Sequence, residues 1–277
     1  MTRAVVLGGG VMGEVLIKAL LDAGWGAGDV VVVERAERRA ADLAATYEIA
    51  TASDAADAVA DAGLVLVAVK PNVVGEVLRE VAGRLSADAV VATVAAGIPL
   101  SFYADVLGAG TAVVRVMPNT PAVVGKGASA ISGGAAATEE HLALVERLLA
   151  PTGLVVRVPE KDLDAVTAIS GSGPAYALYL IDAMAEAGVL LGLTRDLALQ
   201  LATATVEGAA ALVAQSGEHP VVLRERVSSP GGTTVAAVRE LDAGGVRAAV
   251  VQAAVTCRDR SVELGRAYGA ASSATGA

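Results

Sequence analysis

The sequence predicts an α/β domain with a doubly wound, mostly parallel sheet, followed by an all-α domain. Short apolar runs alternate with segments of helical periodicity up to residue 158. A glycine-rich loop joins the first of these runs to the first helical segment. After about residue 160 the strand patterns stop and helical segments follow one another. Strands that alternate with helices are typical of a parallel sheet covered by helices on both faces.

Each predicted strand is a short apolar run rich in Val and Ala, as is typical of buried parallel strands. These strands cover 3–7, 29–34, 64–69, 89–94, 111–116 and 153–158. The helices between them cover 11–24, 36–47, 73–84, 100–107 and 138–150, with a further short helix opened by Ser53. Thr138 is a suitable N-cap, because Glu139 and Glu140 follow it in a first helical turn.

The second part of the chain is predicted to be helical throughout. Its helices cover 160–169, 174–191, 195–215, 219–226, 233–243 and 245–268. Pro174 and Pro220 fall in first turns, where a missing N–H is harmless. The chain therefore divides into a nucleotide-binding domain, residues 1–160, and a helical domain, residues 161–277.

The composition limits the partners and the compartment. A net charge of −9 argues against nucleic acid, and no unbroken apolar run reaches the roughly 20 residues of a membrane helix. The single cysteine and the lack of a signal-peptide pattern favour the cytoplasm. Hydrophobic residues make up 54% of the chain, mostly Ala and Val. Subunit interfaces would explain this surplus, and so would a general bias toward alanine.

Residues 8–13, "GGGVMG", match the spacing G-x-G-x-x-G. The pattern gains weight from its place between the first strand and the first helix, where Gly8 allows the turn, Gly10 lets the backbone approach a pyrophosphate and Gly13 lets helix and strand pack. The intervening Val11 and Met12 belong to the same helix N-terminus, which offers N–H groups to phosphates. We expect a Rossmann-like dinucleotide site; a glycine turn in an unrelated α/β fold is the alternative.

The residues after the second strand give conflicting signals about the nucleotide. Glu34 follows Gly13 by about 20 residues, where an acidic residue binds the adenosine ribose of NAD. Arg35, Arg38 and Arg39 come next, and arginine there accommodates the 2′-phosphate of NADP. A solvated helix face is the alternative for the arginines. We expect NADP, as NADPH, with NAD as the other candidate.

Acid–base side chains are scarce. The chain has two histidines and no lysine after Lys161. His141 is interpreted as solvated on a surface helix and His219 as structural. A dehydrogenase that acts on an alcohol needs a group to move the hydroxyl proton, whereas an imine can arrive already protonated. The scarcity therefore favours reduction of a C=N bond, and no metal site is expected.

The stretch "SSPGGTT", residues 228–234, interrupts the helical region. Pro230 stiffens it, and Gly231 and Gly232 let backbone N–H groups face a small anion. Thr233 and Thr234 add hydroxyl donors at the start of the next helix, whose dipole favours negative charge. The alternative is an ordinary helix start with Thr233 as N-cap.

Several separated motifs resemble one family, the pyrroline-5-carboxylate reductases. They are "VAVKP" (67–71), "AAG" (95–97), "RVMPNTP" (115–121), "SGSGPAY" (170–176) and "VSSPGGTTVAAVRELD" (227–242). The resemblance covers nearly the whole chain. It implies NAD(P)H-dependent reduction of 1-pyrroline-5-carboxylate to L-proline, the last step of proline biosynthesis, by a Rossmann domain joined to an all-α dimerisation domain, in homodimers that can assemble into decamers.

The resemblance also implies roles for individual residues. The cofactor would be lined by Val69, Lys70, Pro71, Ala95, Ala96 and Asn119, together with the glycine loop, Glu34 and Arg35. The substrate carboxylate would be held by Ser229, Gly232, Thr233 and Thr234, of which Thr234 is the candidate catalytic residue. Glu160 and Thr167 would lie near the substrate ring. Glu34 departs from the small polar residue that many members have at its position.

Two other functions fit the predicted fold. β-Hydroxyacid dehydrogenases also join a Rossmann domain to a helical domain, but they depend on a lysine in the helical domain, and this chain has none after Lys161. A non-catalytic nucleotide-binding regulator is the second alternative, because a fold does not fix a function.

Overall fold

The computed structural model describes residues 2–274. By its internal contacts the chain forms two compact units. The first unit runs to Gly171 and resumes at Cys257, and the second is Ser172–Thr256. This partition differs from the sequence division after residue 160, because the first unit also contains the segment up to Gly171 and the end of the last helix.

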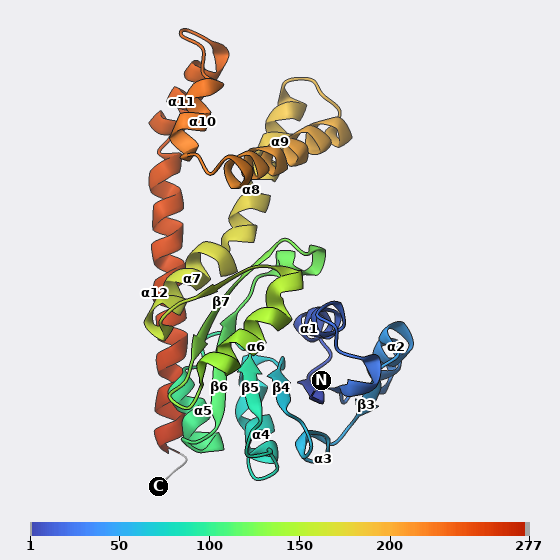
Figure 1. The fold of residues 1–277 in the computed structure, drawn as a ribbon. Coiled ribbons are helices and arrows are strands. Elements are labelled where there is room, and N and C mark those ends of the chain that lie inside the picture. Colours follow the sequence, from blue (N-terminus) through green and yellow to red (C-terminus); the bar gives the residue numbers. More distant parts are fainter. Residues whose placement is uncertain (1, 275–277) are drawn as a thin grey trace. The chain divides into compact units, whose positions relative to one another are not determined.

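An eight-stranded sheet forms the centre of the first unit, in the order β3-β2-β1-β4-β5-β6-β7-β8 (Figure 1). Neighbouring strands are parallel, except that β7 runs antiparallel to β6. Strand β1 pairs with both β2 and β4, so that Leu7 lies opposite Val33 and Val67. The strands are β1 (Ala4–Leu7), β2 (Val30–Val33), β3 (Ala50–Ala52), β4 (Leu64–Val67), β5 (Val90–Thr93), β6 (Ala112–Met117), β7 (Gly127–Gly133) and β8 (Gly153–Arg157).

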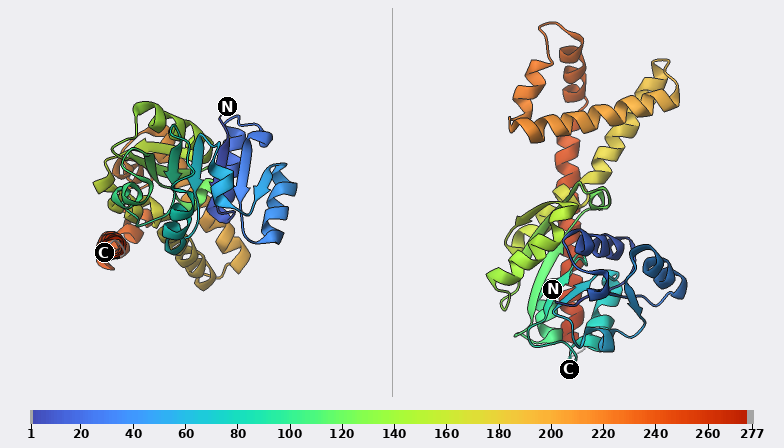
Figure 2. Two further views of the ribbon diagram at one scale, coloured as in Figure 1. Left: turned by 90° about the horizontal axis from the view of Figure 1, so that it is seen from below. Right: turned by 45° about the vertical axis from the view of Figure 1, so that its right-hand side comes forward.

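Helices cover both faces of this sheet (Figure 2). Because successive side chains of a strand point to opposite faces, β1 contributes Val5 and Leu7 to one core and Ala4 and Val6 to the other. The first core is closed by α3 (Ala55–Val59), α4 (Pro71–Val81) and α5 (Leu100–Leu107), and the second by α1 (Val11–Asp22), α2 (Glu37–Tyr47) and α6 (Glu139–Leu149). The predicted doubly wound α/β fold is confirmed.

Short helical turns complete the first unit. They are η1 (Ala27–Asp29), η2 (Thr120–Val124), η3 (Ala150–Thr152), η4 (Glu160–Asp162), α7 (Leu163–Val166) and the π-helical turn η5 (Thr167–Gly171). The end of α12 (Val246–Ala274) also belongs here. Ser261 Oγ donates to Asp164 Oδ1 at 2.6 Å, and the ring of Tyr268 packs edge-on against Phe102.

Several local predictions need correction. Helix α3 begins after Asp54, whose carboxylate accepts from Asp57 N at 2.9 Å, and not after Ser53. Strands β3 and β7 were not predicted, because "ATA" and "GASAISG" are poor in β-branched and aromatic residues. The N-cap at Thr138 is confirmed, and His141 has a structural role there, since its Nδ1 accepts from Thr138 N at 3.1 Å.

The second unit is helical and has little core of its own. It contains α8 (Gly173–Leu190), α9 (Arg195–Ser216), α10 (Pro220–Arg226), α11 (Thr233–Ala243) and the first part of α12. Helices α8 and α9 approach so closely that a Cβ at Gly188 would lie 2.7 Å from the Cβ of Ala198. Among the described residues 172–256, the buried ones are Ala185, Ala198, Ala202 and Leu223.

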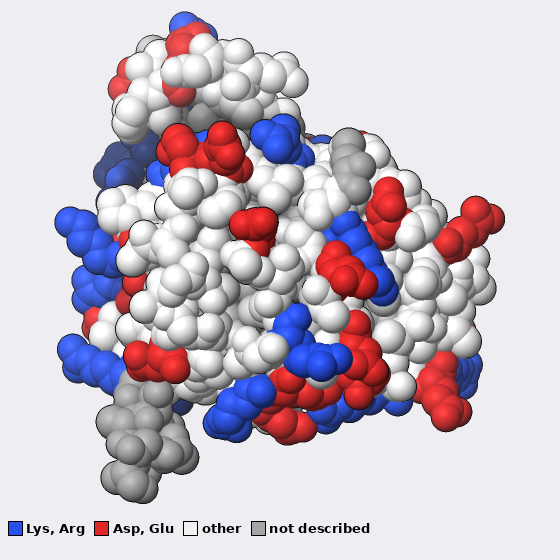
Figure 3. Space-filling model, turned by 60° about the horizontal axis from the view of Figure 1, so that its bottom comes forward, with Lys and Arg blue, Asp and Glu red and all other residues white. Residues whose placement is uncertain are grey.

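Large apolar side chains cover much of this unit's surface. Tyr179 is 80% exposed and Leu190 is 88% exposed. Within residues 2–274, α9 alone is long and apolar enough to cross a membrane by length and composition, although no unbroken apolar run marks it in the sequence. The same length and composition also suit a helix that packs against another subunit. Figure 3 shows one face of the whole molecule, with the bottom of Figure 1 brought forward, on which acidic and basic side chains are interspersed.

Candidate functional site

The predicted cofactor residues gather at one edge of the sheet. Strands β1, β2, β4, β5 and β6 are parallel, so their carboxyl ends meet at this edge. Chain connections change direction between β1 and β4, and open α/β sheets bind ligands at such a switch point. The residues placed there are Gly8, Gly10, Val11, Met12 and Gly13 after β1, Glu34 and Arg35 after β2, Val69, Lys70 and Pro71 after β4, Ala95 and Ala96 after β5, and Asn119 after β6.

The glycine loop has the geometry that a pyrophosphate site needs. Gly8 has a φ of +102°, which side chains rarely adopt. A Cβ at Gly13 would lie 1.9 Å from Gly8 O, so this position requires glycine for the helix to pack on the loop. Gly10 lies at the helix N-terminus, where a Cβ would meet no atom of a non-adjacent residue within 4 Å. The open space above Gly10, next to the N–H groups of α1, fits a phosphate group.

Glu34 is bound to the backbone around this loop. Its Oε2 accepts from Gly9 N at 2.9 Å, and its Oε1 accepts from Ala36 N at 2.9 Å. The carboxylate is therefore held where β2 ends beside the glycine loop. A side chain at Gly9 would collide with Leu43 and approach Glu34, which explains the middle glycine of the three.

The three arginines after β2 do not form one cluster. Arg35 Nη2 binds Glu76 Oε1 at 3.0 Å and lies 3.5 Å from Glu80 Oε2, both on α4. Arg39 turns the other way, where its Nε donates to Gly9 O at 2.7 Å and its Nη2 to Glu14 Oε2 at 2.5 Å. Hydrogen bonding to Glu76 raises the pKa of Arg35. Arg38 is exposed.

A hollow of about 130 Å³ lies between the glycine loop and α4. Its apolar walls come from Leu7, Val33 and Val69, with Val73 and Val77 of α4. Glu34, Arg35 and Glu80 contribute the charged part of its lining. An apolar slot bordered by charged groups, next to the end of β2, suits the adenosine part of a dinucleotide.

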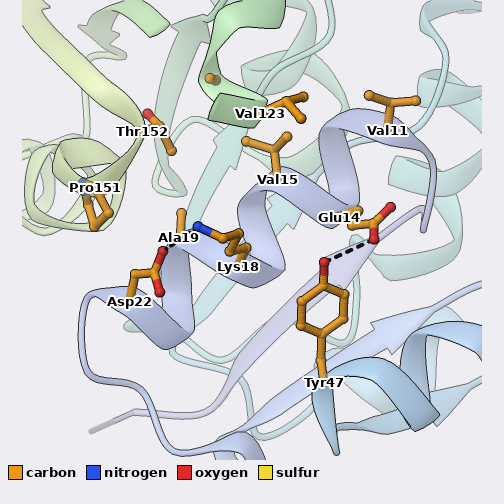
Figure 4. Close-up of a pocket in the computed structure, with 11 residues that line it drawn as sticks. Val11, Glu14, Val15, Lys18, Ala19, Asp22, Tyr47, Val123, Pro151 and Thr152 are labelled. Atoms are coloured by element: carbon orange, nitrogen blue, oxygen red, sulfur yellow. Dashed lines mark hydrogen bonds and ion pairs between the residues drawn. The ribbon is translucent and has the colours of Figure 1, made fainter. Parts of the chain in front are cut away.

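A second hollow, of about 240 Å³, runs along α1 and is lined in part by Val11 and Glu14 (Figure 4). Tyr47 Oη donates to Glu14 Oε1 at 2.9 Å (Figure 4). The hydrogen bond from Arg39 lowers the pKa of Glu14, and burial raises the pKa of Tyr47. Val11 is 67% exposed and lines this hollow.

Asn119, Glu160 and Thr167 have structural partners within the first unit. Asn119 Nδ2 donates to Ser170 O at 3.0 Å and its Oδ1 accepts from Ala128 N at 2.8 Å, so it links β7 to the turn η5. Glu160 Oε1 accepts from Leu100 N at 2.7 Å and from Arg115 Nη1 at 3.0 Å. Thr167 Oγ1 donates to Leu163 O at 2.8 Å. Contact of these residues with cofactor or substrate stays a prediction.

Sequence reasoning missed Arg115, which is 8% exposed on β6 and pairs with Glu160. A charged residue inside the apolar run "TAVVRV" was the available signal, because a buried charge needs a partner. His219 is the N-cap of α10, with its Nδ1 accepting from Val221 N at 3.2 Å. This contact agrees with the structural interpretation of His219.

The loop "SSPGGTT" lies in the second unit, between α10 and α11. Gly231 has a φ of +67°, and the N-cap of α11 is Gly232, with no side-chain cap. The alternative that Thr233 caps the helix is therefore wrong, since Thr233 is already its first residue. Thr234 is half-buried, whereas Thr233 and Ser229 are exposed. The first-turn N–H groups of an uncapped helix are available to an anion.

Comparisons with known proteins identify the family. The family model described as pyrroline-5-carboxylate reductase dimerisation matches residues 160–264, and the one described as NADP oxidoreductase, coenzyme F420-dependent, matches residues 3–97. The pyrroline-5-carboxylate reductase of Corynebacterium melassecola is 46% identical over 96% of this chain and 100% of its own length. That of Mycobacterium tuberculosis (strain ATCC 25618 / H37Rv) is 44% identical over 95% of this chain and 97% of its own length.

Solved structures agree with these relatives. A pyrroline-5-carboxylate reductase from Coxiella burnetii superposes with a TM-score of 0.90 at 30% identity, covering 95% of this chain and 98% of that one. The Plasmodium falciparum enzyme, solved with NADP bound, gives 0.86 at 25% identity and the same coverage. The resemblance seen in the sequence is thus confirmed over almost its entire length: the chain belongs to the pyrroline-5-carboxylate reductase family.

Proposed function

We propose that this chain reduces 1-pyrroline-5-carboxylate to L-proline with NADPH or NADH, the last step of proline biosynthesis. The observation that carries the proposal is the 46% identity to a reductase of this name over 96% of the chain. The glycine loop at the β1–β4 switch point supports it independently, because its geometry suits a dinucleotide.

The first unit would hold the cofactor. The N–H groups at the start of α1 would bind the pyrophosphate above Gly10, and the hollow beside Glu34 would take the adenosine. The strand-end residues Lys70, Pro71, Ala95, Ala96 and Asn119 would line the rest of the cofactor. A bound reduced nicotinamide supplies a hydride to the imine carbon, and the imine nitrogen carries the proton that completes the secondary amine.

The substrate carboxylate would be bound by the loop that precedes α11. Gly232 as N-cap leaves the first-turn N–H groups free of a side-chain cap, and Thr234 adds a hydroxyl donor in the same turn. Together with Ser229 and Thr233 this arrangement would stabilise one carboxylate by hydrogen bonds, without lysine or arginine. Glu160 and Thr167 are proposed to lie near the ring.

The chain forms oligomers through its dimerisation segment, residues 160–264. A homodimer is the proposed state, because the second unit buries only four described residues and exposes large side chains such as Tyr179. A second copy can cover that surface. Assembly to a decamer and a cytoplasmic location are further proposals, the first supported by the family resemblance and the second by the single cysteine.

A cofactor-oxidation assay tests the function. Purified protein, NADPH or NADH, and pyrroline-5-carboxylate are mixed, and absorbance at about 340 nm is followed while proline is measured by amino-acid analysis. We expect stoichiometric proline formation. Oxidation of a β-hydroxyacid in a parallel reaction with NAD⁺ or NADP⁺ would instead support the dehydrogenase alternative. Nucleotide binding without turnover of either substrate would support the regulator.

A further inference from the structure

We infer that this chain binds NADH more tightly than NADPH, and that Glu34 sets the preference. The inference rests on the proposed function, because it concerns the adenosine end of the same cofactor site. It reverses the expectation that the arginines after β2 raised in the sequence. The contacts of Glu34, Arg35 and Arg39 carry it.

Glu34 is placed to accept hydrogen bonds from a ribose. Its two oxygens already accept from Gly9 N and Ala36 N, which fixes the carboxylate at the end of β2. Each carboxylate oxygen can accept more than one hydrogen bond. The free 2′- and 3′-hydroxyls of NADH can therefore donate to Glu34 without displacing the backbone contacts.

The same position is unfavourable for a 2′-phosphate. A phosphate monoester carries a charge of roughly −1.5 to −2 near pH 7, and it can donate no hydrogen bond to a carboxylate when fully ionised. Glu34 cannot easily move away, because both of its backbone contacts would then be lost. The fixed carboxylate of Glu34 would therefore repel the 2′-phosphate of NADPH, whereas it would accept hydrogen bonds from the ribose hydroxyls of NADH.

The neighbouring arginines do not offset this charge. Arg35 is paired with Glu76 and approaches Glu80, and Glu80 is itself tied to α3 by accepting from Ala55 N at 3.2 Å. The carboxylates of Glu34, Glu76 and Glu80 outnumber the guanidinium of Arg35, which leaves this end of the site negative.

Arg39 and Arg38 change this balance little. Arg39 is neutralised by Glu14 and anchored to Gly9 O, on the α1 side of the loop. Arg38 is exposed, so solvent and salt screen its charge. Arg35 Nη2 already contacts Glu76 and Glu80. A 2′-phosphate would therefore compete with these two carboxylates for the charge of Arg35, while an unphosphorylated ribose needs no such partner.

Direct binding tests the preference without any turnover. Isothermal titration of the full chain measures Kd for NADH and NADPH, and also for ADP-ribose and its 2′-phosphorylated form, which lack the nicotinamide. We expect each 2′-phosphorylated ligand to bind about tenfold more weakly or worse. Because salt screens charge repulsion, the difference should narrow as ionic strength rises.

Substitutions assign the preference to its residue. Glu34→Ser should weaken the binding of NADH and strengthen the binding of NADPH. The ratio of the Kd for NADPH to the Kd for NADH should therefore fall by about tenfold or more. Glu34→Gln keeps an oxygen acceptor for Gly9 N and should reduce the ratio through loss of charge alone, so it remains informative if the serine variant folds poorly. Glu37→Gln removes an exposed carboxylate of α2 and should leave the ratio unchanged.

Two results would overturn the inference. One is NADPH that binds the wild type as tightly as NADH, and the other is a ratio that both Glu34 variants leave unchanged. These outcomes are separable from failure of the proposed function. If pyrroline-5-carboxylate is not reduced with either nucleotide, the proposed function fails, while the ratio of the two Kd values can still be measured. If the substrate is reduced but NADH and NADPH bind equally tightly, only the proposed preference fails.

Discussion

Replacing Thr234 with Val removes a hydroxyl from the first turn of α11 while keeping the branched shape of the side chain. The structure separates a binding role of this hydroxyl from a capping role, because Gly232 is the N-cap and no side chain caps the helix. Losing the hydroxyl therefore removes no cap. We expect the melting temperature of Thr234→Val to stay close to that of the wild type.

The expected effect on catalysis is large if this hydroxyl binds the substrate carboxylate. Hydrogen bonds to charged groups contribute roughly 1.5–3 kcal/mol. At about 1.4 kcal/mol for each factor of ten, kcat/KM should fall by roughly 10- to 150-fold. The loss should shrink for a cyclic imine without a carboxylate, because that analogue never makes the bond.

The assay measures kcat/KM for both imines and the melting temperature on the same preparation. Thr46→Val serves as a matched control, since its exposed hydroxyl donates to Asp42 O at 2.8 Å within α2, away from the loop. An unchanged kcat/KM for pyrroline-5-carboxylate in Thr234→Val refutes the carboxylate role of this residue. An equal loss with both imines would also refute it, because the effect would then not depend on the carboxylate.

Three further predictions concern the glycine loop, the oligomer and pH. Gly13→Ala should abolish nucleotide binding in a titration, because its Cβ would lie 1.9 Å from Gly8 O. The control Gly83→Ala has open space around its Cβ and should bind the nucleotide normally. Normal binding by Gly13→Ala would contradict the packing argument. Tyr179→Glu, at a position 80% exposed in the single chain, should weaken the dimer by roughly 30-fold or more in analytical ultracentrifugation, as expected for an interface aromatic, and an unaffected dimer would place the interface elsewhere. Hydrogen bonding lowers the pKa of Glu14 in the folded chain, so its contribution to the free energy of unfolding is present above the unfolded-state pKa and is lost as pH falls through the folded-state pKa. The difference in the free energy of unfolding between wild type and Glu14→Gln, measured with denaturant, should therefore shrink as the pH is lowered. A difference that grows would show the sign to be wrong.

Local patterns were enough to predict most elements of the fold. Helix α11 was predicted at 233–243 and is found at Thr233–Ala243, because glycines precede it and a regular apolar spacing follows. Strand β7 was missed for an equally local reason: in "GASAISG" only Ile131 has a β-branched apolar side chain. Its place in the sheet comes from pairing with β6 and β8, which its own residues do not indicate.

Tertiary pairing limited the prediction of the site. The glycine loop could be recognised because its function depends on residues that are adjacent in sequence. The direction of Arg35 could not, since its partner Glu76 is 41 residues away on α4. Glu34 likewise reaches Gly9 across 25 residues. The sequence showed which charges were near the end of β2, and only the structure shows which of them are already neutralised.

The order of the two units along the chain affects how the protein can be made. Residues 172–256 are an insertion, because the first unit resumes only at Cys257. The bond between Ser261 and Asp164 spans 97 residues of sequence, and Leu264 packs near Gly97. On the ribosome, the sheet can form early, but the end of α12 can pack against the first unit only after the whole helical insertion has been synthesised. The surface that the end of α12 covers is formed by residues near the middle of the sequence, such as Gly97 and Asp164. In a nascent chain this surface therefore stays exposed to chaperones until the last helix has been synthesised.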